Sequence, residues 1–238
     1  GKYGIHPTYI QEMMGDSRYS EEDILAAIEH LKLEGGKKFQ LDTLDSTREF
    51  YNGDAKGLWA PKSLISGREV LILGAGPGVA DHKAAINTQS AVSQNLIDLR
   101  VACHPVRLLA DCGTHTALPQ PLVVPASMLP TDVLQSLAGK ELFDFGLTIK
   151  SNTFSFFSTN AILPNSLVIS YALALATSGK AERILLAGFD GYGADDQRTQ
   201  EMQQVLALYK EANALEVTSI TQTSYSIPVL SVYAMLGA

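Results

Sequence analysis

A glycine-rich turn directly after a strand-like run is the feature that most constrains the fold of this chain. The apolar residues 70–73 lead into Gly74, Gly76 and Gly78. Glycine permits a tight turn and leaves no side chain between backbone amides and a neighbouring group. If a helix begins at Gly78, its free amides and its dipole form an anion site. The pattern therefore predicts a strand, a tight turn and a helix, with phosphate as the natural ligand of the turn.

The turn does not match the complete dinucleotide-binding fingerprint. That fingerprint requires G-x-G-x-x-G, followed about 20 residues later by an acidic residue beside the ribose. Here Val79 occupies the position of the third glycine, and Asp98 falls in a stretch that we expect to be helical. Two interpretations stay open: a nucleotide phosphate binds the turn, or the turn only connects a strand to a helix.

Short apolar runs alternate with helix-like stretches from residue 68 onward, and this predicts an α/β fold. Such alternation is typical of a Rossmann-like, doubly wound and mainly parallel sheet with helices on both faces. We predict strands at 69–73, 106–110, 121–124, 142–149, 183–187 and 216–219. We predict helices at 79–86, 91–102, 127–137, 165–178, 197–213 and 228–236. No strand separates the helix that ends at 86 from the loop at 87, which suggests that residues are absent there.

The first residues form a helical appendage in this prediction. An apolar stripe follows a capping serine at Ser20, and two glycines at 35 and 36 end it. We therefore divide the chain into a helical part at 1–36, a linker at 37–66 and a Rossmann-like nucleotide-binding domain at 67–238. The chain begins with Gly-Lys-Tyr, and we interpret it as a piece of a longer protein.

The charge balance restricts the partners that we expect. The formal net charge is −7 and the isoelectric point is about 5.2, which argues against a nucleic-acid surface. No signal peptide and no membrane-spanning apolar run is recognisable, so a cytoplasmic location and no membrane partner are expected. The expected partner is a nucleotide-type small molecule, and a homo-oligomer stays open.

An acid and a tyrosine follow the predicted strand 183–187. Asp190 and Tyr192 would lie at the carboxyl end of a parallel strand, where open α/β sheets bind ligands. Asp190 could hold Mg²⁺ or a ribose, and Tyr192 could donate a hydrogen bond to a phosphate. The alternative is a simple turn, in which Asp195 or Asp196 only caps the next helix.

Other polar stretches allow both a binding and a structural interpretation. Asn87 and its neighbours could contact a base or sugar, or form a solvated turn. Ser166 could contact a ligand, although N-capping alone explains it. The hydroxyl-rich loop 221–226 could bind phosphate or only cap secondary structure. Cys112 and His115 could form a nucleophile pair, but no third orienting residue is identifiable.

The first 35 residues resemble a known family. The run from Lys2 to Met13, with the helix at 20–34, is similar to the tail that follows the barrel in aldolases of the HMG-CoA lyase and 4-hydroxy-2-oxovalerate aldolase superfamily. That family keeps its metal and catalytic residues in a (β/α)₈ barrel of over 200 residues. The resemblance implies a partner, the absent N-terminal barrel, and no aldolase residue can be carried over to this chain.

A second resemblance covers residues 68–236. Gly74-Ala-Gly76-Pro, the Asn87 loop, the helix start at Ser166 and the run through Asp190 to Tyr192 resemble 6-hydroxymethylpterin diphosphokinase-like proteins and bacterial family 42 sialyltransferases. In the sialyltransferases, the corresponding positions contact the CMP part of the donor, and the tyrosine helps the phosphate to leave.

The resemblance implies a transferase of diphosphate or glycosyl groups in surface-sugar metabolism. It implies catalytic roles for Asp190 and Tyr192, and ligand contacts from Gly74, Gly76, Gly78, Asn87 and Ser166. The chain departs from the sialyltransferases at Ala75, where they have asparagine, and it has no histidine after His115 to serve as the base. Nucleotide or nucleotide-sugar binding is therefore expected, and sialyl transfer is not. The alternative is a non-catalytic regulatory or scaffold domain.

Overall fold

The computed structural model describes residues 51, 53–74, 76, 97–193, 196–212, 214–231 and 233. These residues fold into two compact units, each assembled from separate stretches of the chain. Unit 1 takes its described residues from within 51–59, 99–151 and 159–171. Unit 2 takes them from within 60–98, 152–158 and 172–238. The predicted helical part at 1–36 and half of the predicted linker at 37–66 lie outside the described residues.

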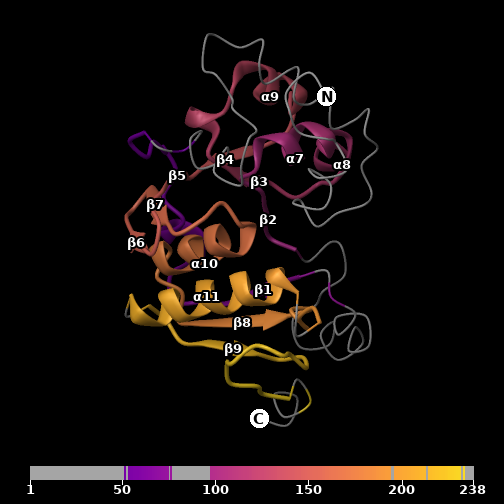
Figure 1. Cartoon of the computed structure of the whole chain (residues 1–238). Helices are drawn as coiled ribbons and strands as arrows, with labels where there is room; N and C mark the ends of the chain where they lie inside the picture. Colours follow the sequence, from indigo (N-terminus) through magenta and orange to yellow (C-terminus); the bar gives the residue numbers. More distant parts are fainter. Residues whose placement is uncertain are drawn as a thin grey trace. The chain divides into compact units, whose positions relative to one another are not determined.

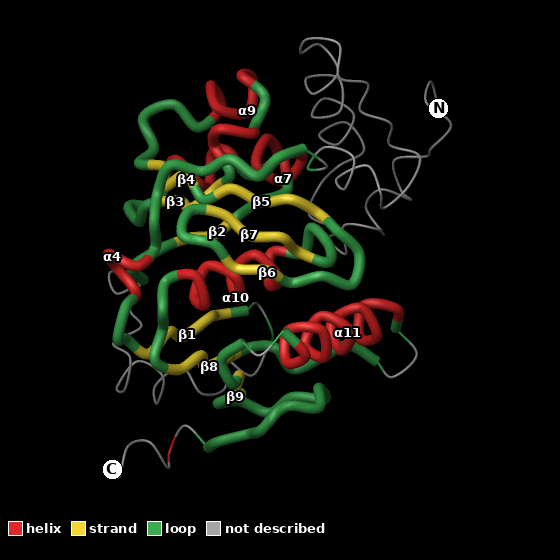
Figure 2. Tube along the Cα trace, turned by 90° about the vertical axis from the view of Figure 1, so that its left-hand side faces the viewer, coloured by secondary structure: helices red, strands yellow, loops and turns green. Residues whose placement is uncertain are grey.

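A parallel sheet forms the centre of unit 2. Its strands β1 (Glu69–Leu73), β8 (Arg183–Ala187) and β9 (Val217–Ser219) lie side by side in the order β1-β8-β9 (Figures 1 and 2). Glu69 lies opposite Arg183, and their side chains form an ion pair at the amino edge of the sheet. The four residues of β8 after Arg183 are buried. A continuous apolar run is what a strand covered on both faces requires.

Three of the helices within the described residues belong wholly or partly to unit 2. They are α4 (Lys62–Ile65), α11 (Gln197–Glu211) and the part of α10 (Val168–Ser178) that begins at Ala172. The residues of α10 from 172 to 176 are all buried, as expected for a helix that is apolar on every side. On α11, the buried ring of Tyr209 packs edge-on against Phe154 and Phe156, with the latter in the short strand β6 (Ser155–Phe156).

Unit 1 contains parallel strands of two further sheets and several short helices. Strands β2 (Arg100–Val101), β3 (Leu122–Val124) and β4 (Leu142–Asp144) pair in that order, and β5 (Gly146–Ile149) pairs with β7 (Asn160–Leu163). The helices are α7 (Pro105–Ala110), α8 (Cys112–Ala117), the 3₁₀ helix η2 (Ala126–Met128) and α9 (Thr131–Ser136). Their shared core consists of Leu108, Leu122, Val124, Leu129, Val133 and Leu137.

The described part of the segment before residue 60 packs tightly in unit 1. The amides of Leu58 and Trp59 donate to the Asp144 carbonyl at 3.0 and 2.9 Å. The Trp59 ring stacks on Phe143 with 4.6 Å between the ring centroids. A Cβ atom on Gly57 would lie 2.1 Å from the Thr159 carbonyl oxygen. This backbone therefore approaches its neighbours so closely that only glycine fits.

The prediction of a mainly parallel α/β fold is confirmed. Strands 69–73 and 183–187 are found with the predicted boundaries, and those at 121–124 and 216–219 are one residue shorter. The helices predicted at 165–178 and 197–213 correspond to α10 and α11. The helix predicted at 79–86 lies outside the described residues.

Several predicted elements are wrong. Residues 106–110 form helix α7 instead of a strand, because Pro105 occupies its first turn, where a missing N–H has no cost. The end of the helix predicted at 91–102 contains strand β2 instead. The strand predicted at 142–149 is two strands, and β6 and β7 were not predicted. At the start of the helix predicted at 228–236, Val229 bridges Ser219 of β9.

Candidate functional site

The glycine turn continues the pairing between β1 and β8 beyond the end of the sheet. The amide of Gly74 donates to the Ala187 carbonyl at 2.8 Å, and that of Gly76 donates to the Gly188 carbonyl at 2.9 Å. A Cβ atom on either glycine would lie 2.5 Å from the Gly188 oxygen. On Gly76 it would also lie 2.9 Å from Oδ2 of Asp190. Close backbone packing therefore requires glycine at both positions and brings the turn against the Asp190 carboxylate.

The loop after β8 depends on two glycines with positive φ angles. Gly188 has φ +75° and Gly191 has φ +100°, a region that residues with a Cβ rarely adopt. A Cβ atom on Gly191 would also lie 1.8 Å from Oγ of Ser224, in the loop that follows β9. These glycines let the loop turn back over the edge of the sheet, which places Asp190 between the turn after β1 and the loop after β9.

Hydroxyl groups of the loop after β9 hold this arrangement together. Oγ1 of Thr221 accepts a hydrogen bond from the Gly188 amide at 3.1 Å, and Oγ1 of Thr223 donates to the Phe189 carbonyl at 2.6 Å. The amide of Ser224 donates to the Asp190 carbonyl at 2.9 Å. Thr221 and Thr223 thus use their hydroxyls within the protein. Three loops at the carboxyl edge of the β1-β8-β9 sheet form one hydrogen-bonded rim.

The structure brings three of the predicted site residues together in unit 2. Gly74, Gly76 and Asp190 lie at this carboxyl edge, and Tyr192 follows two residues later with half of its surface exposed. Gly78 and Asn87 lie outside the described residues. Ser166 belongs to unit 1, so it is described separately below.

Tyr192 is paired with an arginine that the sequence did not indicate. The Arg198 guanidinium lies over the Tyr192 ring at 3.9 Å from its centroid, the geometry of a cation–π contact. The Asp196 carboxylate accepts hydrogen bonds from Nε and a terminal nitrogen of Arg198, the latter at 2.7 Å, and from its amide at 2.9 Å. Hydrogen bonding to Arg198 lowers the pKa of Asp196 below its usual value. Asp196 therefore caps α11, as the structural interpretation of that turn predicts, and also orients Arg198.

Tyr225 completes this group from the loop after β9. Burial raises the pKa of its phenol, and the nearby Tyr192 and Asp196 raise it further. The phenol therefore keeps its proton and can act only as a neutral hydrogen-bonding group. Sequence reasoning missed Arg198, because an arginine at the second position of a helix carries no pattern of its own, whereas Tyr225 lies in the loop 221–226 that its hydroxyls had singled out.

In unit 1, the start of α10 is held by Asn165. Its Oδ1 accepts hydrogen bonds from the Leu167 amide at 3.2 Å and from the Ser170 hydroxyl at 2.7 Å. The Ser166 carbonyl accepts a contact from the Cys103 thiol at 3.4 Å. The capping interpretation therefore applies to Asn165, and a ligand contact from Ser166 stays a prediction.

The nucleophile pair of Cys112 and His115 stays a prediction. Both residues belong to α8, and His115 is buried. Burial lowers the pKa of His115, and the positive charges of Arg100 and Lys140 lower it further, while Asp111 opposes them. Among the described residues, no group of three or more His, Cys, Asp or Glu side chains is arranged to hold a metal ion. No described helix is both long and apolar enough to span a membrane.

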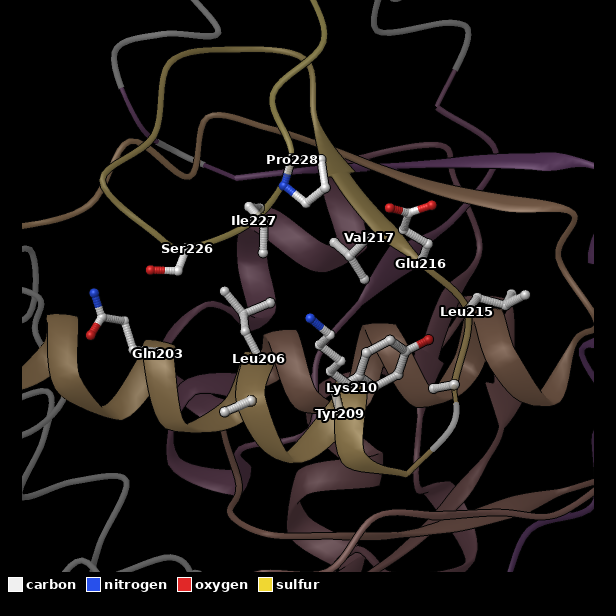
Figure 3. A pocket seen from close by; sticks show the side chains of 12 residues that line it. Gln203, Leu206, Tyr209, Lys210, Leu215, Glu216, Val217, Ser226, Ile227 and Pro228 are labelled. Carbon is white, nitrogen blue, oxygen red and sulfur yellow. The ribbon is translucent and has the colours of Figure 1, made fainter.

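A cavity of about 630 Å³ also lies in unit 2, between α11, the start of β9 and residues 226–228 (Figure 3). Of the predicted candidate residues, it includes only Ser226, the last residue of the loop 221–226. The carboxyl edge and this cavity are therefore separate features of the same unit.

Comparisons with known proteins add a likeness of fold. No family model matches the chain, and no curated protein matches it. The structure is similar to that of the MAf glycosyltransferase from Magnetospirillum magneticum AMB-1, with a TM-score of 0.52 and 11% sequence identity. The match covers 81% of this chain and 38% of the glycosyltransferase chain. The likeness supports the α/β fold, and the aldolase resemblance of the first residues gains no support.

Proposed function

We propose that the carboxyl edge of the β1-β8-β9 sheet binds a nucleotide or nucleotide sugar, as part of a transferase of glycosyl or diphosphate groups. The observation that carries this proposal is the convergence of the turn at Gly74 and Gly76, the Asp190 carboxylate and the loop 221–225 on one edge. Open α/β sheets bind their ligands outside the carboxyl ends of the strands. The fold likeness to a glycosyltransferase supports the same class of ligand.

Each residue has a defined part in this proposal. The turn after β1 approaches the ligand without side chains, so that backbone amides can reach a phosphate. Asp190 accepts hydrogen bonds from the ribose or holds a Mg²⁺ ion on the diphosphate. Tyr192, held under Arg198, donates its phenolic proton to the leaving phosphate. Gly78, Asn87 and Ser166 remain proposed ligand contacts on the strength of the resemblance alone.

The test is a thermal-shift panel of CMP, CDP, CTP, ADP, ATP, GTP, UDP-sugars and CMP-sialic acid, with and without Mg²⁺. A ligand at 100 times its Kd stabilises the folded protein by about 2.7 kcal/mol. We expect a selective response to one base. Asp190→Asn should weaken the response, whereas Asp98→Asn, which removes an exposed carboxylate elsewhere in unit 2, should not. No response from any member of the panel would refute nucleotide binding.

A binding domain without turnover is the second candidate. It is favoured by the observation that Thr221 and Thr223 use their hydroxyls to hold the loops and that close packing alone explains Gly74 and Gly76. Donor hydrolysis separates the two functions. A transferase should release the nucleotide slowly from its sugar donor, and Tyr192→Phe should abolish that release with little change in donor affinity. A regulatory domain should bind the donor and leave it intact.

A further inference from the structure

The cavity of unit 2 has the dimensions of a small-molecule site. Its volume of about 630 Å³ falls within the range of about 300–1,000 Å³ that is usual for ligand pockets. One wall is the second half of α11, and the others are residues 214–217 and the segment 226–228. All of these residues belong to unit 2, so this unit alone forms the cavity.

The cavity is lined mainly by apolar side chains. Leu206 and Val217 are buried, and Ile227 and Pro228 face them from the other side (Figure 3). Removing hydrocarbon from water against such a surface is favourable by about 25 cal/mol per Å². The lining therefore suits a ligand with an apolar body.

A single ammonium group points into this apolar space. In Figure 3, the Lys210 side chain reaches from α11 toward Val217 and Ile227, while the Glu216 carboxylate points away from it. Among the described residues, Lys210 has no hydrogen bond or ion pair through its ammonium. A positive charge beside apolar walls, without an acidic partner, is complementary to an anion that carries hydrocarbon.

We propose that this cavity binds a small organic acid with an apolar body, with its carboxylate on the Lys210 ammonium and its hydrocarbon against Leu206, Val217 and Ile227. One cation matches one negative charge, and Glu216 at the rim disfavours a dianion such as a phosphate monoester. The site is independent of the nucleotide site, because the two share no residue. It gives unit 2 a second ligand, of a different chemical class.

The test compares octanoate with 1-octanol, which has the same hydrocarbon chain and no charge, by isothermal titration calorimetry. We expect octanoate to bind about tenfold more tightly, since a hydrogen bond to a charged group contributes about 1.5 kcal/mol or more. Hexanoate should bind roughly fifteenfold more weakly than octanoate, because each buried methylene contributes about 0.8 kcal/mol, or about fourfold. Salt should weaken the binding of octanoate and leave that of octanol unchanged.

Three variants locate the site. Lys210→Gln should bind octanoate and octanol with about equal affinity. Lys62→Gln, which removes the same charge from α4 of unit 2, should still prefer octanoate about tenfold. Ala207→Phe, at an exposed position that lines the cavity, should weaken the binding of both octanoate and octanol because the larger side chain narrows the cavity. An unfolding midpoint equal to that of the wild type shows that a variant is folded. If Lys210→Gln does not fold, Lys210→Met replaces it in this comparison.

Two results would overturn the proposal. One is the absence of octanoate binding to the wild-type protein at millimolar concentration. The other is an unchanged octanoate preference in the folded Lys210 variant. Neither result bears on the nucleotide panel, which probes the carboxyl edge of the sheet.

Discussion

Replacing Gly74 with alanine tests whether packing or ligand binding explains the glycine-rich turn. The new Cβ atom would lie 2.5 Å from the Gly188 carbonyl oxygen and 3.1 Å from the Phe189 ring. Cβ atoms do not approach other heavy atoms closer than 3.0 Å, so the chain must move by at least 0.5 Å. The Gly188 carbonyl cannot move away easily, because two hydrogen bonds hold this residue. Its carbonyl oxygen accepts a hydrogen bond from the Gly76 amide at 2.9 Å, and its amide donates one to Oγ1 of Thr221.

The cost of this movement can be bounded. The φ angle of Gly74 is not positive, so the added side chain meets a steric clash and no backbone strain. Overpacking of this kind costs about 1–3 kcal/mol. Since 1 kcal/mol shifts the melting temperature of a domain of 150–250 residues by roughly 2–4 °C, Gly74→Ala should lower it by roughly 2–12 °C.

Gly113→Ala is the matched control. Gly113 lies in α8, and a Cβ atom there would meet nothing within 4 Å. Alanine is favoured over glycine inside a helix by about 0.5–1 kcal/mol, so this variant should melt at a higher temperature than the wild type. Both variants are measured without ligand by circular dichroism. If Gly74→Ala melts at or above the wild-type temperature, close packing does not explain why residue 74 is glycine. The remaining explanation is that a ligand approaches the backbone at this position.

Three further predictions concern the folded state. Leu186→Ala, at a fully buried position of β8, should lower the free energy of unfolding by about 2–5 kcal/mol in urea titrations, and a loss below 1 kcal/mol would contradict the packing described. Burial lowers the pKa of His104 from 6.5 to about 4. Between these two pH values, His104 is protonated in the unfolded chain and neutral in the folded protein. Stability should therefore fall as the pH falls from 6.5 toward 4, by about 2 kcal/mol between pH 7 and 5, and His104→Gln should flatten this dependence. Burial raises the pKa of the Cys103 thiol to about 12, so a thiol reagent at pH 8 should modify Cys112 quickly and Cys103 only after unfolding.

The sequence predicts the strands of unit 2 well because their patterns are strong. Residues 70–73 and 184–187 are compact apolar runs, each followed by a glycine, and the strands 69–73 and 183–187 have the predicted bounds. Unit 1 is predicted less well. The run 106–110 is short and apolar, and such a run does not distinguish a strand from a buried helix. The true strand before it, β2, has only two residues and therefore no periodicity.

The candidate site was predictable in outline and not in detail. An acid after a central parallel strand is expected at the carboxyl edge, and Asp190 lies there beside Gly76. The pairing of Arg198 with Tyr192 was not predictable, since it depends on where the loop after β8 places Tyr192 relative to the first turn of α11. The roles of Thr221 and Thr223 in holding that loop depend equally on tertiary structure.

The interleaving of the two units along the chain has a consequence for dissecting the protein. Each unit is built from three stretches, and the division at 171/172 falls inside helix α10. No single proteolytic cut can liberate either unit intact, and truncation at one end cannot leave one complete unit free of the other. Circular permutation would leave the stretches interleaved, so separating the units would require joining the three stretches of one unit with new linkers. Deletion series are the usual route to assigning an activity to one domain, but here even removal of 172–238 would leave unit 1 joined to two stretches of unit 2.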